Sequence, residues 1–162
     1  MTVVVDVANV MGARADGWWR DRAGAAARLC GEVAALARRG LAASELPPDA
    51  AQPAAPAPPD ATQPAQGQVV PDWVLVLEGR ARQAADSLSV EAGSSKSALF
   101  LADSDRLARL LLAPGSGDDA IVDALHGLHG LTIVVTADRE LRWRCQQAGA
   151  VTVGPGWLLR LL

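Results

Sequence analysis

Along the chain, short β-branched apolar runs alternate with longer stretches whose apolar residues recur at helical spacing. Residues 3–5 form an unbroken valine run, which is typical of a strand buried on both faces of a sheet. After a loop at 11–17, residues 18–39 have helical spacing, with Asp16 or Asp21 as the cap. This strand–loop–helix unit predicts that the next strand lies parallel to the first.

The alternation continues to the end of the sequence. Residues 72–77 predict a second buried strand, followed by a short helix at 80–88 and a loop at 89–97. Residues 98–113 fit either a helix or a strand, and we expect a helix or turn first, then a short strand ending at Pro114. The remaining expected elements are a helix at 118–129, a strand at 132–135, a helix at 138–148 with Thr136 as its N-cap, a strand at 150–153 and a terminal apolar turn or helix at 157–162. The alternation favours an α/β fold with a central, mostly parallel sheet.

One stretch breaks this pattern. Between about residues 42 and 71, prolines alternate with Ala, Gln and Asp, and large apolar residues almost vanish. Such a segment cannot bury enough surface to offset the entropy lost on ordering. We therefore predict a single domain over residues 1–162, with a disordered or polyproline-like insertion at about 42–71. A passive loop is favoured over a partner-binding segment, because no PxxP in it is accompanied by a basic residue.

Composition narrows the functional classes. The net charge of -3 argues against a broad basic face for nonspecific duplex binding, although an acidic metal site would itself contribute negative charge. The two cysteines are far apart, which is typical of reduced thiols in a cytosolic protein. The N-terminus has no basic region before its apolar stretch, and no apolar run approaches membrane-spanning length. We expect a soluble, cytoplasmic protein that does not act at a membrane.

Acidic residues follow the apolar segments in a regular way. Asp6 follows the first strand, Glu78 the second, Asp118 and Asp119 follow a turn, and Asp138 follows a later strand. The carboxyl ends of parallel strands meet at one edge of a sheet, so we expect these carboxylates to converge. Like charges at short range raise each other's pKa values, and a hard cation such as Mg²⁺ or Mn²⁺ keeps them ionised. The pattern predicts a divalent-metal site capable of acting on a phosphodiester.

Helix capping is the competing interpretation of these acids. For Asp118 or Asp138 alone, a capping role is about as plausible as metal binding, and Glu78 alone fits a solvated loop. Capping explains the whole set poorly, because Asp6 and Glu78 are expected to open loops rather than helices.

Tryptophans and arginines stand side by side in residues 18–22. Trp18 and Trp19, next to Arg20 and Arg22, could stack on and clamp a single strand of nucleic acid. Packing of both tryptophans between the first long helix and the sheet is the favoured interpretation.

Three short motifs resemble those of one family. Asp6-Val7-Ala8-Asn9 matches the DxxN opening of NYN domains, and Gly117-Asp118-Asp119-Ala120-Ile121 resembles their ADD-x-I segment. Thr136-Ala137-Asp138 resembles the T-[SA]-D turn of the YacP-like branch. Outside the proline-rich stretch, most of the chain therefore resembles an NYN domain of the YacP-like branch of the PIN-like nuclease superfamily.

The resemblance implies a PIN-like three-layer α/β/α fold and a Mg²⁺- or Mn²⁺-dependent ribonuclease site. Asp6, Asp118 or Asp119, and Asp138 would be metal ligands, Asn9 would orient a ligand or the scissile phosphate, and Thr136 would support its turn. The chain departs from the branch in having Glu78 where Asp is usual and Ala8 where Tyr is usual.

We accordingly expect a metal-dependent endoribonuclease that hydrolyses structured or single-stranded RNA. The predicted catalytic residues are Asp6, Asn9, Asp118, Asp119 and Asp138, and Glu78 joins the four aspartates as a predicted metal ligand. The predicted substrate-binding residues are the arginines nearest to the acids in sequence and polar residues in or beside the motifs: Asn9, Arg14, Arg80, Ser116, Thr136, Arg139 and Arg142. The alternatives are a non-catalytic RNA- or protein-binding domain and a nucleotide phosphohydrolase using the same site. A homodimer or a ribosomal or RNA-processing partner is also left open.

Overall fold

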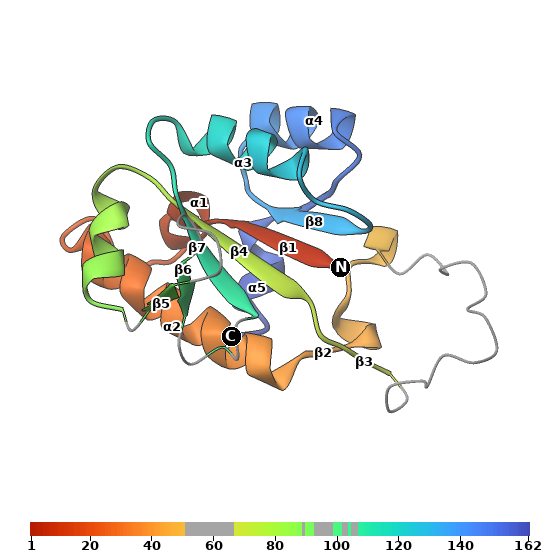
Figure 1. Ribbon diagram of the computed structural model, residues 1–162, viewed down its shortest axis with the longest axis horizontal. Helices are drawn as coiled ribbons and strands as arrows, with labels where there is room; N and C mark the ends of the chain where they lie inside the picture. Colours follow the sequence, from red (N-terminus) through yellow and green to blue (C-terminus); the bar gives the residue numbers. More distant parts are fainter. Residues whose placement is uncertain (51–66, 89, 93–98, 102–103, 105–106) are drawn as a thin grey trace.

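The computed structural model describes residues 1–50, 67–88, 90–92, 99–101, 104 and 107–162 (Figure 1). Its central feature is a seven-stranded sheet in the order β5-β6-β7-β4-β1-β8-β9. The parallel strands are β1 (Thr2–Asp6), β4 (Asp72–Leu77), β7 (Ala108–Leu112), β8 (Thr132–Val135) and β9 (Val151–Val153). The antiparallel strands β5 (Val90–Ala92) and β6 (Leu99–Leu101) extend one edge.

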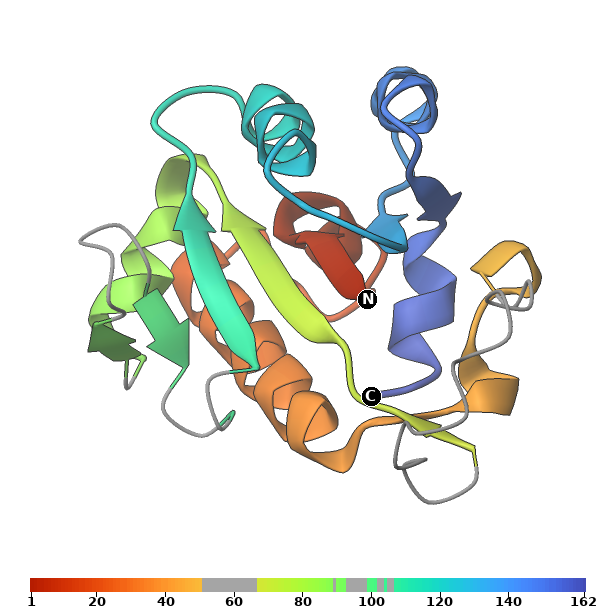
Figure 2. The ribbon, with the colours of Figure 1, turned by 45° about the vertical axis from the view of Figure 1, so that its right-hand side comes forward.

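Helices cover both faces of the sheet, so the fold has three layers (Figure 2). One face carries α1 (Val7–Gly12), α2 (Arg22–Arg39), the 3₁₀ helix η3 (Gly79–Asp86) and α5 (Pro155–Leu159). The other face carries α3 (Gly117–Leu125) and α4 (Arg139–Gln147). The predicted α/β fold, a three-layer α/β/α arrangement around a mostly parallel sheet, is confirmed.

The unbroken valine run of β1 explains its central place. Val3 and Val5 pack into the core under α1, α2 and α5, whereas Val4 packs into the core under α3 and α4. All three side chains have no solvent exposure. A strand that is apolar on both sides can lie only between two helical layers.

The chain reverses direction across the sheet at β1. From β1 it passes through α1 and α2 to β4 on one side, and later through α3 to β8 on the other side. In open α/β sheets, ligands bind outside the carboxyl ends of the strands at such a switch point. The carboxyl ends of β1 and β8 therefore define the position at which a site is expected.

Several element boundaries differ from those predicted. The helix α1 begins directly after β1, where the sequence predicted a loop. The next helix begins at Arg22, and its cap is Asp21, whose Oδ1 accepts a hydrogen bond from the Gly24 amide at 2.9 Å. The prediction of a helix or turn before the strand β7 is wrong for residues 99–101, which form β6. The residues at 93–98, 102–103 and 105–106 lie outside those described.

The proline-rich stretch is ordered at both of its ends, so the predicted insertion at about 42–71 is too wide. The short strands β2 (Leu41–Ala42) and β3 (Gln68–Val69) pair antiparallel. Two 3₁₀ turns, η1 (Ala43–Glu45) and η2 (Pro48–Ala50), follow β2. Residues 51–66, which include most of the predicted insertion, lie outside the described residues.

The two cysteines lie in different cores. Cys30 on α2 belongs to one core and Cys145 on α4 to the other, and both are buried and free. Burial raises the pKa of the Cys30 thiol to about 12 and that of Cys145 to about 11. Thiols of this kind are largely unreactive at neutral pH. Within the described ranges, no helix is both long enough and apolar enough to cross a lipid bilayer.

The two glycines of α2 differ in the space that is available for a substituted side chain. An Ala side chain at Gly31 would meet no atom within 4 Å, whereas at Gly24 its Cβ would lie 2.0 Å from Oδ2 of the capping Asp21. We expect Gly31→Ala to raise the free energy of unfolding by about 0.5–1 kcal/mol, because glycine is costly in a helix. In Gly24→Ala, loss of the cap should cancel this gain. Urea denaturation of both variants measures the difference, and equal stabilisation would contradict the assigned cap.

Candidate functional site

Asp6 is the last residue of β1 and also the N-cap of α1. Its Oδ1 accepts a hydrogen bond from the Asn9 amide at 3.0 Å, and its Oδ2 accepts one from the Asn9 side-chain Nδ2 at 2.7 Å. The third residue after an N-cap normally faces the cap, which explains the DxxN spacing in structural terms. The expectation that Asp6 opens a loop rather than a helix is therefore wrong.

A second segment reaches Asp6 from β8. The Thr136 hydroxyl donates a hydrogen bond to Asp6 Oδ2 at 2.9 Å, although the two residues lie 130 positions apart. The Ala137 amide donates to Asn9 Oδ1 at 3.3 Å. These bonds join the DxxN segment to the Thr136-Ala137-Asp138 turn across the switch point between β1 and β8.

Asp6 is 6% exposed, and this environment changes the acidity of its carboxyl group. Burial raises the pKa of Asp6, and the negative charge of Glu78 adds to this effect. The hydrogen bonds from Asn9 and Thr136 oppose it without cancelling it. Asp6 is thus a carboxylate held in a fixed orientation at a place where its charge is costly.

Asp118 lies in the first turn of α3 and is half-buried. Burial raises the pKa of Asp118, and the charges of Asp6, Asp138 and Glu78 raise it further, while Arg144 opposes the rise. Four of the five predicted acids therefore lie close enough to interact electrostatically. The structure brings these residues together at the carboxyl edge of the sheet.

Glu78 follows β4 and precedes η3, so it too opens a helical turn rather than the predicted loop. Its Oε2 accepts a hydrogen bond from the Gly117 amide, the first amide of α3, at 2.7 Å. A Cβ at position 117 would lie 2.7 Å from the same oxygen, so glycine is required for this close approach.

Asp138 is exposed and caps α4. Its Oδ1 accepts a hydrogen bond from the Leu141 amide at 2.8 Å, and its own amide donates to Thr136 Oγ1 at 3.2 Å. Asp138 rather than the predicted Thr136 is therefore the N-cap of α4. Thr136 instead links Asp6 to this cap.

Asp119 has a different environment from Asp118. Its side chain is 65% exposed, and its Oδ1 pairs with Arg144 Nη2 of α4 at 2.7 Å. Neighbouring residues of a helix point about 100° apart, so only one of two adjacent acids can face the cluster. The structure does not bring Asp119 to the site as a free carboxylate.

Most of the predicted substrate-binding residues have other roles or positions. Arg14 pairs with Glu32 on α2, and Arg142 donates to the Thr152 Oγ1 at 3.3 Å, which ties α4 to β9. Asn9 and Thr136 contact Asp6. The remaining three are exposed: Ser116 before α3 without a side-chain capping bond, Arg139 at the start of α4, and Arg80 on η3.

A hollow of about 410 Å³ lies beside the acidic cluster. Besides Asn9 it is lined by small residues: Ala8 and Gly12 of α1, its C-cap Ala13, and Ala137 of the turn between β8 and α4. No sequence signal predicted this hollow, because small residues have no pattern of their own until the fold brings them together. Because these lining side chains are small, an extended ligand would be able to approach Asn9 closely.

The acids fit a hard divalent cation by chemistry. Their oxygens are the ligand type that Mg²⁺ and Mn²⁺ prefer. Burial first, and neighbouring carboxylates second, raise the pKa values of Asp6 and Asp118, and a bound cation would offset both effects. In the part of the chain that the structure describes, no group of three or more His, Cys, Asp or Glu residues forms a ready-made cage. Mg²⁺ commonly uses one or two carboxylates together with water and substrate phosphates, so the absence of a cage there is compatible with this ion.

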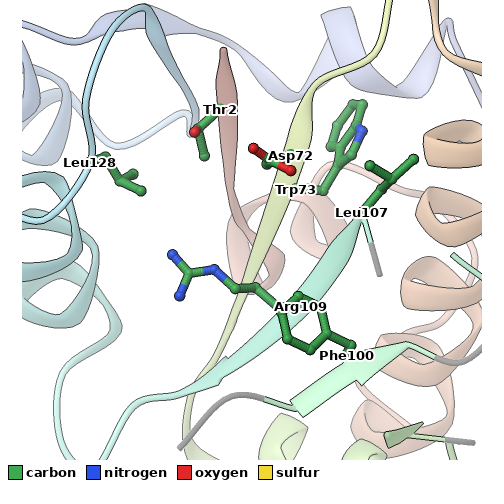
Figure 3. A pocket seen from close by; sticks show the side chains of 7 residues that line it. All are labelled: Thr2, Asp72, Trp73, Phe100, Leu107, Arg109 and Leu128. Carbon is green, nitrogen blue, oxygen red and sulfur yellow. The ribbon is translucent and has the colours of Figure 1, made fainter. Parts of the chain in front are cut away.

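A separate hollow of about 240 Å³ lies at the opposite edge, where β1 and β4 begin (Figure 3). It is lined in part by Thr2, Asp72 and Arg109, and the guanidinium of Arg109 extends away from Trp73. The indole Nε1 of Trp73 is buried without a hydrogen-bond partner among the described residues. None of the acids of the cluster lines this hollow.

Comparison with known proteins finds no protein-family profile, curated protein or solved structure that matches the chain significantly. The resemblance to NYN domains therefore stays a prediction based on three short motifs. Any function assigned to this chain depends on its fold and on the geometry of the acidic cluster.

The raised pKa of Asp6 predicts a pH dependence of stability. Protonated Asp6 stabilises the fold below the ordinary aspartate pKa of about 3.9, and this contribution is lost as the pH rises through the higher pKa of the folded state. The free energy of unfolding of wild type minus that of Asp6→Asn should therefore fall as the pH rises from acid to neutral. Urea denaturation at a series of pH values measures it, and a constant or rising difference would contradict the assignment.

Proposed function

We propose that the chain is a Mg²⁺- or Mn²⁺-dependent endoribonuclease acting at the acidic cluster. The observation that carries the proposal is the buried Asp6 side chain, which Asn9 of α1 and Thr136 after β8 hold at the switch point. The raised pKa of Asp118, caused by burial and by three neighbouring carboxylates, gives independent support for an electrostatically strained acidic site.

Asp6, Glu78, Asp118 and Asp138 are the residues that would hold the cation. When bound, the ion would supply an activated water and neutralise charge on the phosphate. The chain contributes the orientation of the donors, because Asp6 is fixed by Asn9 and Thr136 and cannot turn away from the edge of the sheet.

Hydrolysis joins a water oxygen to phosphorus and breaks the bond from phosphorus to the leaving oxygen. The attacking water, which the bound ion would make more acidic, would give up its proton to solvent. The leaving oxygen would take a proton from solvent. The hollow beside Asn9 gives room for the ribose-phosphate backbone next to these groups.

A non-catalytic binding domain is the second candidate, and one observation favours it. Oxygens of Asp6 and Asp138 already accept hydrogen bonds from backbone amides as helix caps. Carboxylates used only in this way would stabilise helices and would not need a metal. Because these two acids already cap helices, RNA cleavage and not RNA binding is the measurement that distinguishes the two candidate functions.

Adjacent aspartates give a sharp test of the nuclease proposal. We expect Asp6→Asn and Asp118→Asn to lower Mn²⁺-dependent cleavage of RNA by about 10²-fold or more, because each removes a charge at the reacting centre. Asp119→Asn should cleave nearly as well as wild type, because Asp119 is exposed and paired with Arg144. Single-turnover assays on labelled single-stranded and structured RNA measure these rates.

Asp123→Asn, an exposed substitution further along α3, is the matched control. A chelator should abolish cleavage by the wild type. Equal cleavage by wild type and Asp6→Asn, or no cleavage of any RNA with either metal, would refute the nuclease proposal. A mononucleotide panel with phosphate detection distinguishes the nucleotide phosphohydrolase, which would act on mononucleotides and leave RNA uncut.

A further inference from the structure

A second hollow, of about 480 Å³, lies between the start of α2 and η3. The turn before α2 contributes Trp19 and Arg20 to its lining, and the first residue of α2 contributes Arg22. The 3₁₀ helix η3 contributes Arg80 and Gln83. We call it the Trp–Arg hollow. It combines an aromatic ring, three guanidiniums and an amide in one place.

Trp19 does not pack as the sequence predicted. Trp18 is half-buried against the core, but Trp19 is 59% exposed, so only the first of the two tryptophans joins α2 to the rest of the fold. The Trp18 and Trp19 rings meet edge to face at 6.3 Å, which supports the exposed ring from one side. A large exposed aromatic ring is available for stacking.

Among the residues that the structure describes, no carboxylate pairs with a guanidinium of the hollow. Within the described residues, neither Arg20 nor Arg80 forms a salt bridge, and Arg22 lies 5.1 Å from the centre of the Trp18 ring. Asp21 also lines the hollow, but its Oδ1 accepts the hydrogen bond of the Gly24 amide. The hollow therefore has an excess of positive charge in a chain whose net charge is -3.

The Trp–Arg hollow is lined from segments that follow strands at the same edge of the sheet as the acidic cluster. Arg80 follows Glu78 by two residues at the end of β4. The turn with Trp19 and Arg20 joins α2 to α1, which carries Asn9. A ligand held in the hollow can therefore extend toward the cluster.

We propose that the Trp–Arg hollow binds single-stranded RNA, with a base stacked on Trp19 and phosphates on Arg20, Arg22 and Arg80. The inference rests on the proposed function, since it places the strand that flanks the cleaved bond. Aromatic stacking with guanidinium contacts to the backbone is how proteins bind single strands without sequence readout. A duplex fits less well, because its bases are already stacked and the chain has an excess of acidic residues.

Binding without cleavage separates this inference from the nuclease proposal. The test is fluorescence anisotropy of labelled oligouridylate with the full chain in chelator, over a range of salt concentrations. Wild type should bind the single strand more tightly than an RNA duplex of equal length. Trp19→Ala should weaken binding by about fivefold or more, the lower limit for loss of one stacked base. Trp143→Ala is the matched control, because Trp143 is 61% exposed on α4 and lies outside the hollow.

The arginines are tested through the salt dependence. Arg20→Gln and Arg80→Gln should each reduce the slope of log affinity against log salt concentration by about 0.7, the value for one phosphate contact on a single strand. Arg38→Gln, an exposed change at the other end of α2, should leave the slope unchanged.

The inference is overturned if wild type does not bind the single strand or prefers the duplex. It is also overturned if Trp19→Ala binds like Trp143→Ala, or if the slope is unchanged in Arg20→Gln and Arg80→Gln. Binding that depends on the hollow in a chain that cuts no RNA would support this inference and refute only the nuclease proposal. Cleavage that is unaffected by Trp19→Ala, with unchanged binding, would refute only this inference.

Discussion

The burial of one carboxylate constrains much of this structure. A polar side chain on a residue that is 6% exposed must be hydrogen-bonded, and the Asp6 carboxyl group has hydrogen-bond partners from two segments that are distant in sequence. The register of β1 against β8 pairs Val5 with Val135, which sets the following residues, Asp6 and Thr136, side by side. A shift of β8 by one residue would turn Thr136 away and leave the carboxylate without its hydroxyl partner. The sheet register, the start of α1 and the turn before α4 therefore all depend on how Asp6 is satisfied.

Capping and clustering turn out to be compatible roles for the acids. Asp6 and Asp138 each accept a backbone amide at the start of a helix, and each still contributes negative charge to the surroundings of Asp118. A carboxylate has two oxygens, and Asp138 uses Oδ1 for its cap. Capping also fixes the direction of the side chain, which is what a binding site requires of its donors. The two interpretations of these residues differ in what they predict for catalysis and not in geometry.

The elements that the sequence predicted best are the strands buried on both faces of the sheet. The strands β1, β4 and β8 were predicted from unbroken apolar runs, because a central parallel strand needs such runs. The helix α1 was missed, since six residues are too few to show helical periodicity, and its cap looked like the end of a strand. Sequence order predicted that the acids would meet at one edge. It could not choose between Asp118 and Asp119, because that choice depends on the rotation of α3 about its own axis, which packing of Ile121 and Leu125 sets.

The short ladder of β2 and β3 has a consequence for how this chain can change. Gly40, with a φ of +71°, turns the chain out of α2, and a Cβ there would lie 3.1 Å from the Val69 carbonyl oxygen. The glycine lets the two strands close at the base of the proline-rich stretch, before the chain enters β4. The pairing of β2 with β3 therefore fixes the path of the chain from α2 to β4. Residues 43–50 remain tied to the fold, because Ala50 is buried in the core and the Glu45 carbonyl accepts a hydrogen bond from the Trp157 indole at 2.8 Å. Changes in length between η2 and β3 can therefore leave the sheet and its acidic edge as they are.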